Sequence, residues 1–167
     1  VSRESLIRAY RYTEEKLMNT VAEIHDMIIF VRDDAITYIN RAGIEFLGYS
    51  EPWEILGRKE VEFYLFPEDR EELIRQLESS GKVKNFELIL KKKNGGKTFG
   101  LLSAVAVLEG GKVREIISIT KDVNERMETE NKIRVMNLDL TKANRELKET
   151  HLLMLRQEKL AAVGQLA

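Results

Sequence analysis

Residues 36–70 read ITYINRAGIEFLGYSEPWEILGRKEVEFYLFPEDR, and this stretch decides the fold class. Asn40 follows a short strand-like segment and is a good N-cap for a helix that begins directly after it. Gly48 and Gly57 can adopt conformations that residues with a Cβ atom avoid, so they predict the ends of two short helical pieces. Pro67 favours the first position of a third, longer helix.

Strand-like segments flank these helices on both sides. The two that precede them are joined at Asp33-Asp34, and the three that follow are separated by Asn94-Gly95-Gly96 and Gly110-Gly111, which are hairpin signals. The five segments are 27–31, 35–39, 83–90, 97–108 and 113–119. Two hairpin groups separated by helices predict an α+β domain with an antiparallel sheet and helices on one face.

A helix is expected at each end of this domain, which divides the chain into residues 1–24, 25–122 and 123–167. The first helix is amphipathic, with Glu14 interrupting an apolar stripe. The stripe contains Ile7, Tyr10, Leu17, Val21 and Ile24. It is expected either to pack on its own domain or to pair with a second copy. From Lys121 onward charged residues dominate, and no Pro or Gly occurs before Gly164, which predicts one long helix.

The composition argues against several kinds of site. The chain has no cysteine and only two histidines, which are far apart in the sequence, so we expect no disulfide, cysteine nucleophile or metal site. The 27 Lys and Arg residues nearly balance the 28 Asp and Glu residues, so the chain has no excess of positive charge that would favour binding to nucleic acid. No apolar stretch approaches the ~20 residues that span a bilayer. No Walker motif or other catalytic pattern is present, so no catalytic residue is assigned.

Several short motifs, in this order and spacing, resemble the PAS family of sensor domains. They are Ile39-Asn40-Arg41-Ala42, Phe46-Leu47-Gly48-Tyr49-Ser50, Glu54-Ile55-Leu56-Gly57-Arg58, Phe66-Pro67-Glu68-Asp69-Arg70 and Ser118-Ile119-Thr120-Lys121-Asp122-Val123-Asn124-Glu125-Arg126. The resemblance covers about residues 23–126 and implies a PAS fold with a five-stranded antiparallel sheet. It also implies that Asp122 bonds back to the core and couples the domain to the last helix. A simple cap on that helix is the alternative.

A second, shorter resemblance lies at the end of the chain. Residues 157–167, QEKLAAVGQLA, resemble the opening of the dimerisation and phosphoacceptor helix of sensor histidine kinases. In that family the phosphorylated histidine follows such a motif, so it is expected beyond Ala167, and His151 is expected to be an exposed helix residue. The resemblance implies a longer parent protein, an ATP-dependent protein histidine kinase that uses ATP and Mg²⁺ and a response regulator.

The family resemblance also allows cofactors to be tested. Members that bind flavin covalently use a cysteine, and haem-binding members ligate iron through a histidine in the helices; the chain has no cysteine, and residues 41–81 contain no histidine. We therefore expect neither cofactor. The expected pocket wall is apolar and favours a small apolar or planar ligand, with plain core packing as the alternative. It contains Ile29, Val31, Phe46, Trp53, Phe63, Leu77, Leu88, Val105 and Ile117.

Apolar residues of the long helix recur at alternating spacings of three and four, as the contact line of a coiled coil requires. This seam contains Ile133, Met136, Leu140, Ala143 and Leu147, and then, after a one-residue shift in phase near Thr150, Leu153, Leu160 and Val163. We expect a homodimer through this helix. The phase shift is interpreted as a joint between two registers.

These observations together predict a sensory PAS module that relays its state through a dimeric coiled coil to a histidine kinase core. We expect it in the cytoplasm, in a parent that membrane segments upstream could anchor. Two alternatives remain open at this stage. One is a protein-binding or dimerisation module that senses nothing, and the other is a PAS input to a different output, such as a nucleotide cyclase or a chemoreceptor.

Overall fold

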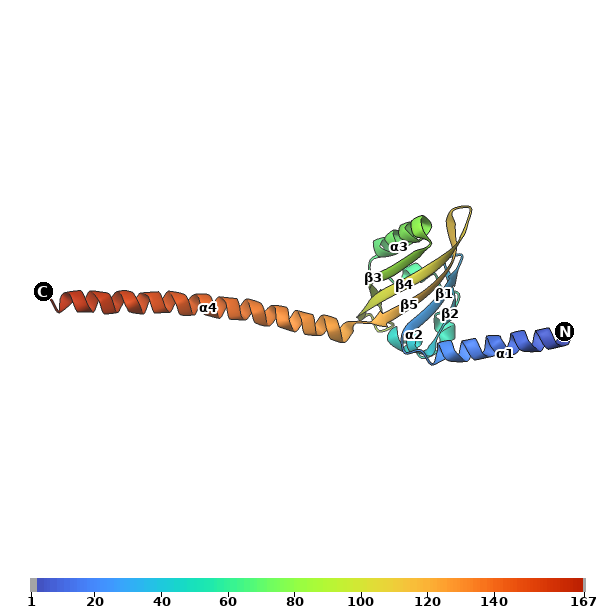
Figure 1. Ribbon diagram of the computed structural model, residues 1–167, viewed down its shortest axis with the longest axis horizontal. Helices are drawn as coiled ribbons and strands as arrows, with labels where there is room; N and C mark the ends of the chain where they lie inside the picture. Colours follow the sequence, from blue (N-terminus) through green and yellow to red (C-terminus); the bar gives the residue numbers. More distant parts are fainter. Residues whose placement is uncertain (1–2, 167) are drawn as a thin grey trace. The chain divides into compact units, whose positions relative to one another are not determined.

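The computed structural model describes residues 3–166, which form two compact units that divide between Asn124 and Glu125. The first unit contains all the strands and every helix except the last (Figure 1). The helices of this unit are α1 (Arg3–Ala22), α2 (Arg41–Phe46) and α3 (Pro67–Ser80), with two short 3-10 helices, η1 (Pro52–Glu54) and η2 (Glu60–Phe63). The second unit is helix α4, Asn124–Gly164, apart from its first residue.

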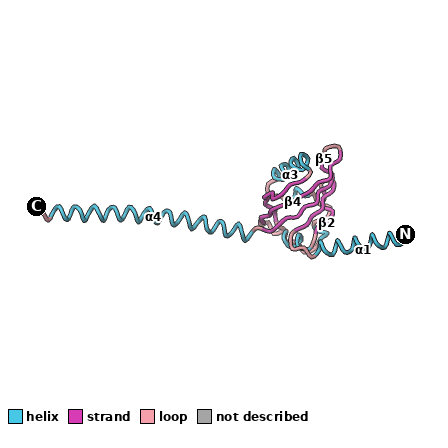
Figure 2. The backbone as a smooth tube through the Cα atoms, in the orientation of Figure 1, coloured by secondary structure: helices cyan, strands magenta, loops and turns pink. Residues whose placement is uncertain are grey.

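Five strands form one antiparallel sheet, which Figure 2 draws in magenta. They are β1 (Met27–Arg32), β2 (Ala35–Ile39), β3 (Lys82–Lys91), β4 (Lys97–Glu109) and β5 (Lys112–Asp122). Their order in the sheet is β2-β1-β5-β4-β3. The first and last strands of the domain are therefore neighbours at the centre. The predicted α+β PAS fold, with its five-stranded sheet and its helix at each end, is confirmed.

The turn signals act as the sequence predicts. Asp33 and Asp34 both have positive φ, 49° and 68°, and so do Gly110 and Gly111, 58° and 78°. Two successive residues in this region make the tight hairpin turn that matches the twist of the strands. Gly81 ends α3 with φ 74°, where its N–H donates to the Leu77 carbonyl.

The core lies between the sheet and the helices α2 and α3. Leu47, Ile55, Leu73 and Leu77 have no measurable exposure. They pack against inward-facing residues of the strands, such as Leu88.

Strand β4 contradicts part of the expected core. Apart from Leu102, its buried inward-facing residues are small or polar, namely Thr98, Gly100 and Ala104, whereas Val105 and Val107 on the other face are 53% and 56% exposed. Ile117 pairs with Val105 on the same outer face and is 44% exposed. Val105, Val107 and Ile117 of this hairpin therefore point away from the core. The expectation that Val105 and Ile117 line an internal pocket is wrong.

The two terminal helices bury no side chain completely. The seam residues of α4 are exposed, among them Met136 at 69% and Leu147 at 68%. In α1, Tyr10 is 71% exposed and Leu17 is 60% exposed. Within residues 3–166, no helix has the length and apolar character that crossing a membrane requires.

Candidate functional site

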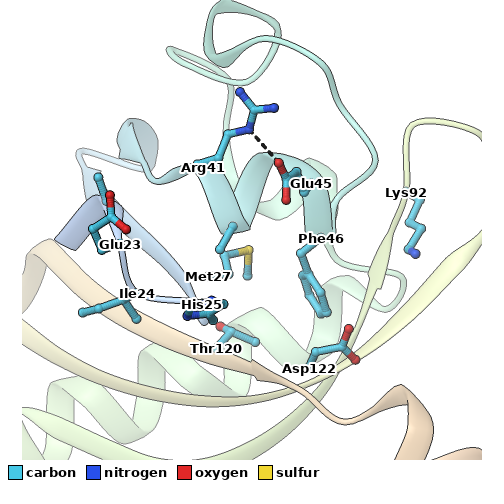
Figure 3. Close-up of a pocket in the computed structure, with 12 residues that line it drawn as sticks. Glu23, Ile24, His25, Met27, Arg41, Glu45, Phe46, Lys92, Thr120 and Asp122 are labelled. Atoms are coloured by element: carbon cyan, nitrogen blue, oxygen red, sulfur yellow. Dashed lines mark hydrogen bonds and ion pairs between the residues drawn. The ribbon is translucent and has the colours of Figure 1, made fainter. Parts of the chain in front are cut away.

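A cleft opens at one end of the sheet, where β1 begins and β5 ends (Figure 3). Its volume is about 680 Å³. Its walls come from the segment between α1 and β1, from α2, from Lys92 and from the last residues of β5. The residues labelled in the figure are Glu23, Ile24, His25, Met27, Arg41, Glu45, Phe46, Lys92, Thr120 and Asp122.

Most charged groups of this cleft are exposed. Arg41 donates from Nε to Glu45 Oε1 at 2.6 Å across one helical turn, and this hydrogen bond raises the pKa of Arg41. Their side chains are 75% and 62% exposed, so the pair contributes little to stability. The cleft floor is less polar, because the apolar side chains of Met27 and Phe46 contribute to it. Met27 is 4% exposed, and Phe46 packs against the core.

An enclosed void lies deeper, between the sheet and the helices. It measures about 10 Å³, which is roughly enough for one water molecule. Ile29, Phe63 and Leu88 line it, as the sequence predicted. Met27 and Thr120 line both the void and the cleft. The two spaces are therefore separated by these two side chains.

Two hydroxyl groups of the void wall, those of Thr120 and Tyr64, are each 1% exposed. The Tyr64 hydroxyl interacts with the Glu60 carboxyl, whereas the Thr120 hydroxyl has no hydrogen-bond partner among the described residues. The orientation of Thr120 has a local cause: a Cβ atom at Gly100 would lie 2.5 Å from the Thr120 methyl carbon, so that methyl occupies the space that glycine leaves. Buried polar groups are nearly always paired, so the unpaired Thr120 hydroxyl is unusual.

One residue of the void wall, Glu60, belongs to a buried ion pair. The Arg70 guanidinium donates to Glu60 Oε2 at 3.2 Å and to Asp34 Oδ1 at 2.8 Å, and it thereby ties α3 to η2 and to the β1–β2 turn. The side chains of Arg70 and Glu60 are 12% and 5% exposed. Burial raises the pKa of the Glu60 carboxyl, and the nearby Arg70 charge opposes that shift. Burial, together with the Glu60 charge, raises the pKa of Tyr64 well above its usual value.

The structure brings only part of the predicted pocket wall together. Val31 and Leu77 are buried in the core without lining the void, and Phe46 lines the outer cleft. Trp53 is 70% exposed, because it lies on the three-residue helix η1 and points to solvent, so its assignment to the pocket is wrong. The polar groups Glu60, Tyr64 and Thr120 were missed.

At the junction before α4, Asp122 and Asn124 make different contacts. Asp122 Oδ1 accepts from the Asn124 backbone N–H at 2.8 Å, which is a local contact at the start of the helix. Asn124 makes the bonds back to the sheet: its Oδ1 accepts from Phe99 N–H at 3.0 Å, and its Nδ2 donates to Thr98 Oγ1 at 2.7 Å. The bond to the core that was predicted for Asp122 is thus made by Asn124. Its place in the family motif, where many members have threonine, is the signal that could have identified it.

Asn40 holds the opposite junction, where α1 leads into the sheet. Its Oδ1 accepts from Gly43 N–H at 3.0 Å, as an N-cap does, and also from Ile28 N–H at 2.9 Å. Its Nδ2 is within hydrogen-bond distance of the carbonyls of Val21 at 3.3 Å, Ile24 at 3.2 Å and Asp26 at 2.9 Å. One buried amide therefore joins the end of α1, the start of β1 and the start of α2.

Comparisons with known proteins agree with this architecture. The PAS domain of an HTR-like protein from Haloarcula marismortui is 25% identical with a TM-score of 0.57, over 72% of this chain and 99% of that one. An RNA-binding light-oxygen-voltage receptor is 21% identical with a TM-score of 0.60, over 74% of this chain, which spans only 37% of the receptor's length. A PAS domain from a two-component sensor histidine kinase is 14% identical with a TM-score of 0.57, over 68% of this chain and 98% of that one.

No curated protein matches the sequence. A family model described as PAS domain matches residues 25–125, which is more than half of the chain. The matched segment contains the whole sheet and the Asn124 junction. It also contains both cavities, except for the part of the cleft wall that residues 22–24 form. With the strand order and the motifs in agreement, the chain belongs to the PAS domain family, whose members are sensory and signalling domains.

Proposed function

We propose that this chain is the sensory PAS module of a two-component sensor histidine kinase, and that it relays its state through a parallel, two-stranded coiled coil. The observation that carries the proposal is helix α4, which has 41 residues and no buried side chain. Its seam residues Ile133, Leu140 and Leu147 are 53%, 60% and 68% exposed. A helix of this length with an apolar stripe needs a partner, and a second copy supplies the same stripe.

The sequence after the phase shift supports a kinase as the output. Residues 157–167 resemble the opening of the dimerisation and phosphoacceptor helix, which a cyclase or a chemoreceptor would not need. We propose that the kinase core, with ATP and Mg²⁺, and the response regulator belong to the longer cytoplasmic parent protein. The phase shift near Thr150 then joins two registers, so a small change of helix rotation in the sensor could favour one kinase state over the other.

A protein-binding module without sensing is the second candidate, because the outer face of the sheet is apolar. Tyr38, Phe30, Ile117 and Val105 form a row of paired positions across four strands. The Phe30 and Tyr38 rings are 4.8 Å apart. An apolar row of this kind is typical of protein-interaction surfaces.

The dimer is tested with Leu140→Asp, which would bury an unpaired charge in the seam and should convert the dimer to a monomer. Leu138→Asp is the matched control: Leu138 is equally exposed, at 63%, but lies two residues away on the far side of the helix from the seam. Sedimentation equilibrium of both variants gives the answer. A Leu140→Asp variant that remains as dimeric as the parent would rule out this seam.

The kinase output is tested in the full-length parent. Deleting or inserting one residue near Thr150 should change autophosphorylation, because it alters how the two halves of the seam are phased. A four-residue substitution of the same segment that keeps its length is the control. Unchanged autophosphorylation in the deletion and the insertion would remove the relay from the proposal.

A further inference from the structure

We propose that Glu60, Arg70 and Asp34 form a proton switch, in which Glu60 takes up one proton and thereby loosens the tie between helix α3 and η2. The first support is the charge of the cluster. One guanidinium, that of Arg70, lies between two carboxylates, 3.2 Å from Glu60 Oε2 and 2.8 Å from Asp34 Oδ1. The cluster therefore has one negative charge in excess, and a single added proton makes it neutral. The inference goes beyond the proposed function and requires neither the dimer nor the kinase.

The unequal burial of the two carboxylates decides which of them takes the proton. The Glu60 side chain is 5% exposed and the Asp34 side chain is 69% exposed, so water stabilises the charge of Asp34 far better. The Glu60 backbone N–H donates to the Asp34 carbonyl at 3.0 Å, which keeps the two residues together. Burial raises the pKa of Glu60, the Arg70 charge opposes this rise, and the Asp34 charge adds to it. Glu60 is therefore the carboxyl of this cluster that is protonated first as the pH falls.

Few groups influence this balance. The charged groups that act on the Glu60 carboxyl are Arg70 of α3 and Asp34 of the β1–β2 turn, and Tyr64 is the titratable group beside it. The strand residues that line the void next to Glu60 are uncharged, and the polar ones among them are Ser118 and Thr120 of β5. The switch is thus contained in a cluster that joins one helix, one turn and η2.

Both protonation states leave the polar groups of the cluster with partners. In the ionised state the Arg70 guanidinium and the Tyr64 hydroxyl interact with the Glu60 carboxylate. In the neutral state the Glu60 carboxyl carries an O–H, and the Tyr64 hydroxyl can accept it, because a hydroxyl both donates and accepts. Arg70 then keeps a charged partner in Asp34. Since the pKa of Glu60 is raised by folding, protonation favours the folded state, and the switch operates without unfolding the domain.

The segment that contains η2 is where the protonation should have its effect. At its start, residues 57 and 58 bond to the edge strand β2: Gly57 N–H donates to the Ile36 carbonyl at 2.8 Å, and Ile36 N–H donates to the Arg58 carbonyl at 2.9 Å. The Arg70–Glu60 pair joins the same segment to α3. A hydrogen bond between two charged groups is stronger than one with a neutral partner, so protonation weakens this second attachment. We expect η2 to open locally more often when Glu60 is neutral.

The protonation is tested by NMR in the 167-residue chain, with the side-chain carboxyl carbon of Glu60 followed as the pH is lowered. We expect its titration midpoint at a higher pH than in the same chain unfolded in urea, and the Arg70 Nε signal should shift with the same midpoint. Asp34→Asn removes the neighbouring negative charge and should move the midpoint to lower pH. Glu72→Gln is the matched control, because Glu72 pairs with Arg75 at the surface, and it should leave the Glu60 midpoint unchanged.

The effect on η2 is tested with Glu60→Gln, which has nearly the same shape as glutamic acid and is uncharged at every pH. At neutral pH, hydrogen exchange of the Tyr64 amide, which donates to the Val61 carbonyl, should be several-fold faster in this variant than in the parent. The Gly81 amide at the end of α3 is the internal control and should exchange equally in both.

Four results would overturn the inference. They are a Glu60 midpoint no higher than in the unfolded chain, an Arg70 signal that does not follow it, a midpoint that Asp34→Asn leaves in place, and equal exchange of the Tyr64 amide in Glu60→Gln and the parent. The titration uses the unaltered chain, so it decides the question even if a variant folds poorly. None of these measurements involves α4, and their failure would leave the proposed dimer and kinase output to their own tests.

Discussion

Replacing Arg70 with methionine should destabilise the first unit by about 3–5 kcal/mol at pH 7, because it leaves the Glu60 carboxylate buried and unpaired. The structure sets this magnitude. The Arg70 and Glu60 side chains are 12% and 5% exposed, so solvent screens their pairing very little. A domain of this size has a total stability of roughly 5–15 kcal/mol, so the variant should be near the limit of folding.

The loss should depend on pH in a direction that the structure determines. Burial already raises the pKa of Glu60, and replacing Arg70 removes the strongest of the interactions that oppose that shift. A carboxyl whose pKa is higher in the folded than in the unfolded state favours folding when it is protonated. The variant should therefore be most stable below the unfolded pKa of Glu60, about 4.3, and should lose stability as pH rises through the folded pKa.

Urea unfolding of the parent and the variant at several pH values between 4 and 8 measures both effects. Arg75→Met is the matched control, because Arg75 pairs with Glu72 on the surface with 71% of its side chain exposed, and it should cost less than about 1 kcal/mol. Glu60→Leu combined with Arg70→Met should recover most of the loss, since it removes both charges. A loss in Arg70→Met no larger than in Arg75→Met, or one that grows toward low pH, would refute the reasoning.

Four further substitutions test the junction, the core and the exposed Trp53 by thermal or urea unfolding. Asp122→Ala should lower the free energy of unfolding by only about 1 kcal/mol and leave the domain folded. Asn124→Ala should lower it by about 1–3 kcal/mol, because this variant leaves polar groups of β4 unpaired. Equal losses in the two variants would mean that the two residues do not differ as described. Gly100→Ala should be strongly destabilising because its Cβ would meet the Thr120 methyl at 2.5 Å, and a change below 0.5 kcal/mol, which is about the effect of an ordinary surface substitution, would contradict that contact. Trp53→Ala should stay within about 1 kcal/mol, and a larger loss would show that the exposed ring has an unrecognised partner.

The fold could be predicted because its signals are local. Pro67 and Gly81 mark the start and the end of α3 through backbone geometry alone, and Asn40 caps α2 as expected. The two hairpin turns after β3 and β4 likewise follow from glycine positions. These residues act on their neighbours in sequence, so a single sequence reveals them.

The candidate site depends on which face of a strand meets the helices, and this is not a local property. In β4 both faces carry apolar residues, and the branched ones, Val105 and Val107, suggested the wrong face. The inward face has glycine at position 100 because the Thr120 methyl of the neighbouring strand β5 fills the space beside it. Glu60 was missed for a related reason, since its charged neighbours Lys59 and Glu62 suggest exposure and its partner Arg70 is ten residues away.

The contacts of Asn40 also define where an independent sensor unit must begin. The family match starts at residue 25, yet two of the three carbonyls that receive the Asn40 amide, those of Val21 and Ile24, lie before that point. A chain trimmed to the matched segment would keep every strand and still leave this buried amide short of acceptors. In a chimera that joins this sensor to a foreign effector, a fusion point upstream of Val21 preserves the complete set of acceptors. The physical domain is therefore longer at its amino-terminal end than the segment by which the family is recognised.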